Sequence, residues 1–213
     1  MNPSVVSSVL PFPNILWWCH SLNYNIVIWD LAEHFEKMSF RNRYEIATAN
    51  GRLKMTVPLK NGRDQKVAMN ELEISYAENW QKQHWRTLLS AYNRSPYFEY
   101  YAPSLEELIM QRHEKLKNLN LASYEWLKLQ LGLNRESSFI FSYESETNEN
   151  VPDLRLINGK NILANNANFP TYYQVFAERN GFLPNLSLLD LLFAEGPHTL
   201  SYVKQNSSKI IFL

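Results

Sequence analysis

The order of apolar and polar residues predicts a strand, a helix and a second strand at the start of the chain. Ser4 to Leu10 is predicted as the first strand, and a short helix near Asn14 to His20 follows the Pro-Phe-Pro turn. The β-branched run NIVIWD, residues 25–30, is typical of a buried strand. Three elements this close together predict a compact βαβ-like unit.

A hairpin should follow this unit. Asn50-Gly51 is the strongest short hairpin signal in the sequence, so the stretch through Val57 is predicted as two antiparallel strands joined at this turn. Asn61-Gly62 indicates another turn, with a strand near Leu72 to Tyr76 after it. The first third of the chain is therefore expected to be mainly sheet.

The middle of the chain has a helical period. A helix over ENWQKQHWRTLLSAYN, residues 78–93, would carry its apolar residues on about half of its circumference. These residues are Trp80, His84, Trp85, Leu88, Leu89, Ala91 and Tyr92. A second helix is predicted to begin at Ser104 with a capping box to Glu107, and a third to run from about Tyr124 to Leu131.

The last part of the chain is predicted to contain a loop-rich segment and a buried helix. Residues 134–169 are rich in asparagine and contain one apolar strand candidate, SFIFSY, so they are interpreted as an excursion of one domain spanning residues 1–213. The apolar run Leu188 to Ala194 predicts a buried helix, capped by Ser187 with Asp190. The expected fold class is therefore mixed α/β, of the α+β kind.

Composition and charge narrow the function classes. Twenty-one basic residues balance twenty-one acidic ones, so no global field favours nucleic acid or an anionic membrane. The N-terminal stretch has no features of a signal peptide, and no run of roughly eighteen apolar residues predicts a membrane span. The single cysteine, Cys19, excludes an intramolecular disulfide and suits a reducing compartment, so we expect a cytoplasmic protein.

Known cofactor and metal motifs are missing. The six glycines form neither a dinucleotide nor a triphosphate cradle, so a bound nucleotide would be held by side chains. The histidines show no metal-ligand spacing, and no G-x-S-x-G elbow occurs. We therefore expect neither a cofactor nor a metal. The six tryptophans suit sugar or base stacking, or they fill the core.

The stretch SFRNRYEI, residues 39–46, is the first candidate for chemistry. In a strand, Arg41 and Arg43 share one face with their Cα atoms roughly 6.5–7 Å apart, so their guanidinium groups can converge on one phosphate or carboxylate. The alternative is a solvated strand face on which Arg43 pairs with Glu45. Asn42 lies between the two arginines.

His84 is the second candidate, because it lies inside the apolar arc of its helix. Burial beside tryptophan would keep the imidazole neutral, which suits a general base. A general base needs an orienting group, and Asp30, at the end of a strand, is the nearest plausible carboxylate. The alternative is a core histidine with one hydrogen-bond partner.

Three blocks of sequence resemble the WbqC-like family, which is named after a protein of a bacterial O-antigen gene cluster. The blocks are HFEKMSFRNRYEIATANGRLKMTVPL, ENWQKQHWRTLLSAYNRSPYFEYY and QVFAERNGFLPNLSLLDLLFAEGP. Longer relatives begin with a Gln-Pro-x-Tyr-Leu-Pro element, whereas this chain has Leu10-Pro11-Phe12-Pro13. The candidates Arg41, Asn42, Arg43, Trp80, His84, Tyr92 and Gln174 all lie inside the three blocks.

The resemblance implies a transferase for acyl or aminoacyl transfer to an activated sugar or small metabolite, in the biosynthesis of surface polysaccharides or specialised metabolites. His84 and Asp30 would be catalytic. The anionic or nucleotide-sugar substrate would be bound by Arg41, Asn42, Arg43, Trp80, Tyr92 and Gln174. Two alternatives remain, a non-catalytic binding protein for a sugar or nucleotide sugar and a scaffold or partner subunit.

Overall fold

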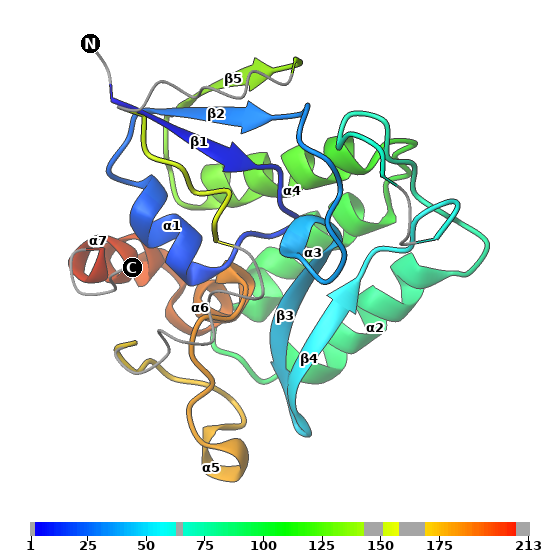
Figure 1. The fold of residues 1–213 in the computed structure, drawn as a ribbon. Helices are drawn as coiled ribbons and strands as arrows, with labels where there is room; N and C mark the ends of the chain where they lie inside the picture. Colours follow the sequence, from blue (N-terminus) through cyan, green and yellow to red (C-terminus); the bar gives the residue numbers. More distant parts are fainter. Residues whose placement is uncertain (1–2, 63–65, 143–150, 158–168, 208–213) are drawn as a thin grey trace.

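The computed structural model shows a mixed α+β fold, as the sequence predicts (Figure 1). A small parallel sheet lies along one side of the molecule, with the helices and a separate two-stranded hairpin below it in the view of Figure 1. The structure describes residues 3–62, 66–142, 151–157 and 169–207.

The predicted βαβ-like start is confirmed. Strand β1 (Ser4–Ser8) pairs in parallel with β2 (Ile26–Asp30), and helix α1 (Ile15–Ser21) connects them. The side chain of Asn14 caps α1, because its Oδ1 accepts from the amide of Trp17 at 2.9 Å. Both strands therefore direct their carboxyl ends toward the same edge of the sheet (Figure 1).

The third strand of the sheet comes from the asparagine-rich stretch. Strand β5 (Glu136–Ile140) pairs in parallel with β2, which gives the order β1-β2-β5. The strand candidate SFIFSY, residues 138–143, is thus confirmed, but the observed strand begins two residues earlier and ends at Ile140. Pairing with β2 satisfies the backbone of this strand, although the strand buries little side-chain surface. Residues 143–150 and 158–168 of this stretch lie outside the described residues.

The predicted hairpin is also present. Strands β3 (Arg43–Thr48) and β4 (Gly51–Thr56) are antiparallel, and Gly51 has a φ of 95° at the turn. The strand predicted near Leu72 to Tyr76 is wrong, since that segment forms only isolated bridges, from Ile74 to Leu59 and from Glu73 to Lys115.

Three long helices make up the middle of the chain, α2 (Trp80–Tyr92), α3 (Phe98–Met110) and α4 (Leu116–Gln130). The capping box predicted at Ser104 is wrong, because α3 begins earlier and the Ser104 hydroxyl donates to the carbonyl of Tyr101. Leu89 is 37% exposed and does not belong to the buried face of α2.

The chain closes with short helices. They are α5 (Ala177–Asn180), α6 (Leu188–Glu195), the 3-10 helix η3 (Gly196–His198) and α7 (Thr199–Asn206). Helix α6 is buried from its first residue to Ala194, as predicted. A Cβ atom at Gly196 would lie 2.5 Å from the ring of Tyr97, so only glycine allows the start of η3 to lie this close to the residue before α3.

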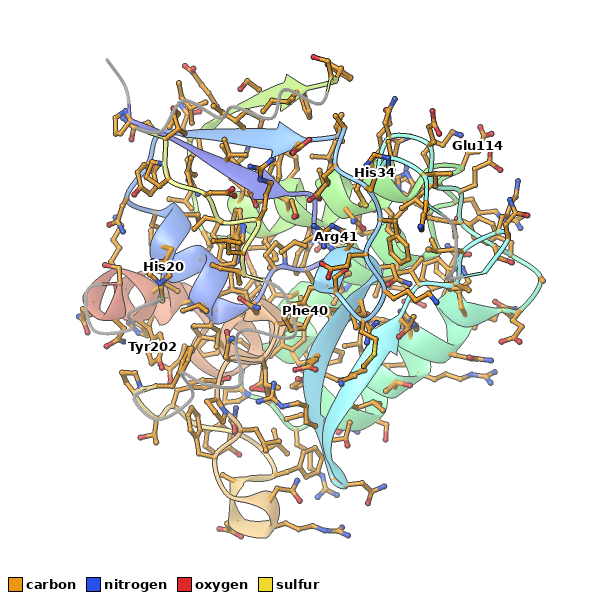
Figure 2. The ribbon with its side chains drawn as sticks, in the orientation of Figure 1. His20, His34, Phe40, Arg41, Glu114 and Tyr202 are labelled. Atoms are coloured by element: carbon orange, nitrogen blue, oxygen red, sulfur yellow. The ribbon has the colours of Figure 1, made fainter. Side chains whose placement is uncertain are left out.

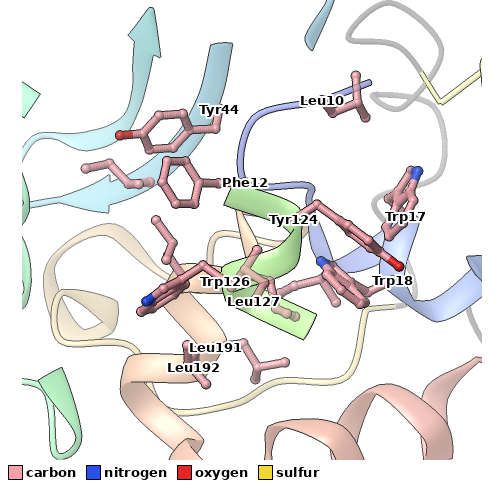
Figure 3. Close-up of a cluster of buried hydrophobic side chains, with 14 of the residues drawn as sticks. Leu10, Phe12, Trp17, Trp18, Tyr44, Tyr124, Trp126, Leu127, Leu191 and Leu192 are labelled. Atoms are coloured by element: carbon pink, nitrogen blue, oxygen red, sulfur yellow. The ribbon is translucent and has the colours of Figure 1, made fainter. Parts of the chain in front are cut away.

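Aromatic side chains fill the core beneath the parallel sheet. Trp17 stacks on Trp29 with 5.7 Å between ring centroids, and Trp18 stacks on Tyr124 at 5.5 Å. Figure 3 shows Trp17, Trp18 and Tyr124 together in this cluster. All four rings are inaccessible to solvent, so three of the six tryptophans serve packing rather than ligand stacking. No helix among the described residues is sufficiently long and apolar to cross a bilayer.

Candidate functional site

The two arginines of SFRNRYEI do not share a strand face. Arg41 lies in the 3-10 helix η1 (Phe40–Asn42), whereas Arg43 is the first residue of β3. The cause is local, since the Ser39 hydroxyl caps η1 by accepting from the amide of Arg41 at 3.4 Å. The predicted strand over residues 39–42 is therefore wrong, and the expectation that Arg41 and Arg43 share a strand face is wrong with it.

Two carboxylates engage the guanidinium group of Arg41. Its Nη2 lies 2.6 Å from Oε2 of Glu33, and its Nη1 lies 3.4 Å from Oε2 of Glu36. Asn42 has a structural contact, because its side-chain amide donates to the carbonyl of Val57 at 2.9 Å. Arg43 is buried and pairs along the hairpin with Thr56.

His84 lies in the core between α2 and the hairpin. Its Nδ1 is 3.3 Å from the hydroxyl of Tyr44, and its Nε2 is 3.2 Å from the carbonyl of Thr56. Trp80 packs edge-on against the imidazole with 5.0 Å between centroids and is itself buried. Burial lowers the pKa of His84 to about 4, so the ring is neutral at pH 7. The expected pairing with Asp30 is wrong, because both ring nitrogens face other groups.

Tyr92 and Gln174 belong to a second buried polar cluster, centred on Asp190. The hydroxyls of Tyr92 and Tyr172 each donate to the Asp190 carboxylate at 2.9 Å, and Nε2 of Gln174 donates at 3.1 Å. Ser187 caps α6, but Asp190 does not complete the predicted capping pair, since its carboxylate is held by these three side chains. The cluster links α2, α6 and the segment before α5.

The Asp190 cluster predicts a pH dependence of stability. Burial, opposed by the donors around it, raises the pKa of Asp190 from 3.8 to about 6, so the folded protein holds this proton at a higher pH than the unfolded chain does. Stability is therefore expected to fall as the pH rises from 3.8 toward 6.

Urea denaturation between about pH 4 and about pH 7 measures this loss. Asp190→Asn should reduce the change in unfolding free energy across the range, whereas the exposed Glu106→Gln should follow wild type. Parallel curves for wild type and Asp190→Asn would contradict the prediction.

A cavity opens at the carboxyl ends of β1 and β2, in which the guanidinium groups of Arg41 and Arg155 meet several carboxylates. We call it the sheet-edge cavity; it encloses about 400 Å³. Its lining residues are Glu33, His34, Glu36, Arg41, Asp153, Arg155 and Leu156. Figure 2 shows His34 and Arg41 on the segment that leaves β2. Ligands of parallel α/β sheets bind at this edge, beyond the carboxyl ends of the strands.

Asp30 borders this cavity. Its Oδ2 lies 2.6 Å from Nη1 of Arg155, while Nη2 of Arg155 contacts Asp153 at 2.7 Å. The other carboxylate oxygen of Asp30 accepts from the amides of Ala32 and Glu33 at 3.0 and 2.9 Å. Asp30 is therefore linked to Arg41 by Glu33, whose amide contacts Asp30 and whose carboxylate contacts Arg41. The partners of the Asp30 carboxylate are Arg155 and two backbone amides, and His84 is not among them.

Glu33 and Arg41 each have one buried polar atom that no described residue contacts. Oε2 of Glu33 accepts from the Ser8 hydroxyl at 2.8 Å and from Arg41, but no described residue donates to the buried Oε1 of Glu33. The buried Nε of Arg41 likewise has no partner in the described chain. Burial raises the pKa of Glu33 even though Arg41 and Ser8 act to lower it. Oε1 of Glu33 and Nε of Arg41 are hydrogen-bonding capacity that the described chain leaves unused beside the cavity.

Sequence reasoning missed Glu33, Asp153 and Arg155. The available signal for Glu33 was its place three residues after Asp30, at the end of a predicted buried strand of a βαβ unit. Asp153 and Arg155 carry no such signal, because they lie in the asparagine-rich stretch. Among the described residues, no group of histidine, cysteine, aspartate and glutamate side chains is arranged to hold a metal ion.

The fold and the cavity define an α+β protein with a polar cavity at a sheet edge. The model of the WbqC-like protein family matches residues 22–165, more than half of the chain, so the chain belongs to the WbqC-like family. An uncharacterized protein of Mycobacterium tuberculosis, Rv1507c, is 26% identical over 200 residues, covering 80% of this chain and 85% of that protein. No solved structure matches the chain.

Proposed function

We propose that the protein is a transferase that places an acyl or aminoacyl group on a sugar or small metabolite, in surface polysaccharide or specialised-metabolite biosynthesis. The proposal rests on the buried carboxylate of Glu33, a residue that lines the sheet-edge cavity. One oxygen of this carboxylate accepts no hydrogen bond from any described residue. Membership of the WbqC-like family is consistent with this proposal.

The charge around the cavity favours a ligand that donates hydrogen bonds. Each guanidinium group contacts two carboxylates, Arg41 with Glu33 and Glu36, and Arg155 with Asp30 and Asp153. Carboxylates thus outnumber guanidinium groups, and little positive charge is left over for an anion. An amine or hydroxyl group of the acceptor fits better, because it can donate to the carboxylates that line the cavity, Glu33 among them.

This arrangement supports a general-base mechanism. As the acceptor nitrogen or oxygen attacks the carbonyl carbon of the donor, its proton passes to Glu33, and the bond from that carbon to the leaving thiolate or phosphate breaks. Arg41 and Ser8 hold the Glu33 carboxylate in place during the transfer. In this proposal Glu33 takes the role that the sequence suggested for His84.

The donor is an anionic acyl or aminoacyl thioester or phosphate, because a nucleotide-linked sugar has no activated carbonyl and can serve only as the acceptor. It would approach the cavity from solvent, with its activated carbonyl next to the group held by Glu33. We also propose a cytoplasmic location, which the single reduced cysteine Cys19 suits.

Product analysis tests the function. The protein is incubated with acyl thioesters or acyl phosphates in pairs with free or nucleotide-linked amino sugars, and mass spectrometry follows the acceptor. The expected result is an acceptor heavier by one acyl group, together with a higher melting temperature in the presence of the acceptor. Ligand binding with no product for any pair would favour a binding protein. Neither binding nor product would favour a scaffold.

A further inference from the structure

A second cavity lies at the turn end of the β3–β4 hairpin, whereas η1 adjoins the other end. It runs between the turn of β3–β4 and helix α2, encloses about 430 Å³, and is closed on one side by Phe176. A smaller hollow of about 180 Å³ adjoins it, and both are lined by Ser90, Ala91 and Phe176. We call the two together the hairpin groove. Its main volume is within the usual range for small-molecule sites.

Positive charge collects in the hairpin groove. Arg52 and Arg86 line the larger hollow, and Arg94 lines the smaller one. Arg52 pairs with Glu45 at 2.5 Å, whereas Arg86 and Arg94 form no ion pair within the described part of the chain. None of the described lining residues is acidic. The hairpin groove therefore carries an excess of positive charge, whereas carboxylates are in excess in the sheet-edge cavity.

The groove also has an apolar wall. Phe176 is partly buried and packs against the main core, so its ring is held in place, and buried Ala91 continues the apolar surface. The hydroxyl of Ser90 lies on the same side as Arg86, one turn further along α2. A fixed ring beside two guanidinium groups suits a flat ligand with an attached anion.

We propose that the hairpin groove binds a nucleoside phosphate, with the base against Phe176 and the phosphates at Arg86 and Arg94. Guanidinium groups bind phosphate in a bidentate manner, and an aromatic face accepts any base. The groove shares no lining residue with the sheet-edge cavity. The proposal therefore does not depend on the transferase function.

Isothermal titration with adenosine diphosphate tests the site on the full-length protein. We expect saturable binding that weakens as sodium chloride is added, and that is tighter than the binding of pyrophosphate or of adenosine alone. Arg86→Gln should weaken the binding at least about tenfold, the loss expected for one charge-assisted contact. The matched control Lys204→Gln removes one exposed positive charge on α7 and should bind as wild type does.

Three results would overturn the proposal. The first is no heat of binding for adenosine diphosphate with wild type. The second is equal affinity in wild type and Arg86→Gln. The third is loss of binding in Glu33→Gln with full binding in Arg86→Gln, since the nucleotide would then occupy the sheet-edge cavity. Melting curves of each variant without ligand show that the fold is kept.

Discussion

Glu33→Gln is expected to lower the turnover number about 10²–10⁴-fold, the usual contribution of a general base. Glutamine keeps the size of the side chain and can still accept from Ser8 or Arg41, but it cannot take a proton from the acceptor. The Michaelis constant of the acceptor should rise less than the turnover number falls, because the single amide oxygen stays with Ser8 and Arg41 and only one contact to the acceptor is lost. Steady-state kinetics with the acceptor pair found by product analysis measures both constants.

The pH profile separates a chemical role of Glu33 from a structural one. Burial raises the pKa of Glu33 above 4.5, its ordinary value, so the wild-type rate should rise with pH through a pKa above 4.5 and be lost below it. Glu33→Gln should lack this limb. Glu36→Gln is the matched control, since Glu36 is the other carboxylate at Arg41 and its side chain is 42% exposed. This variant should lose less than about tenfold in rate. Equal losses in the two variants, with both pH limbs intact, would contradict the assignment of Glu33 as base.

The elements of the fold could be predicted where the signal is local. The β-branched run before Asp30, the turn at Asn50-Gly51 and the apolar period that starts at Trp80 each determine backbone geometry within a few residues. The prediction failed where a longer-range contact decided. Strand β5 has an exposed, weakly apolar sequence, and it is a strand because β2 offers its edge.

The candidate site likewise could be predicted only where the signal was local. Arg41 was found from its residue type, but an alternating pattern cannot reveal that Ser39 starts a 3-10 turn, which separates Arg41 from Arg43. His84 was correctly placed in the core, but its neighbours Tyr44 and Thr56 come from the hairpin, far away in sequence. The sheet-edge cavity combines residues from position 33 to position 156, and only the folded sheet brings them together.

Trp29→Ala is expected to lower the free energy of unfolding by about 3–5 kcal/mol, the usual cost of truncating a buried aromatic residue. Trp29 is fully buried on β2, stacks on Trp17 at 5.7 Å and meets Tyr124 edge-on at 4.8 Å. For a chain of this size, the loss corresponds to roughly 6–20 °C in melting temperature. Urea and thermal denaturation, followed by circular dichroism, measure it.

Two further variants keep this prediction testable. Tyr100→Ala removes an aromatic ring of similar size that is 79% exposed, so its effect should stay within about 0.5 kcal/mol. Trp29→Phe keeps a ring in the cluster but loses volume and the hydrogen bond from Nε1 to the Ser137 hydroxyl, 3.2 Å away, so it should lie between wild type and Trp29→Ala. If Trp29→Ala and Tyr100→Ala destabilised the protein equally, the packing beneath the parallel sheet would not be what holds β2 in the centre of the fold.

Since β2 carries Asp30 and leads directly to Glu33, a loss of that packing should also weaken acceptor binding in the sheet-edge cavity.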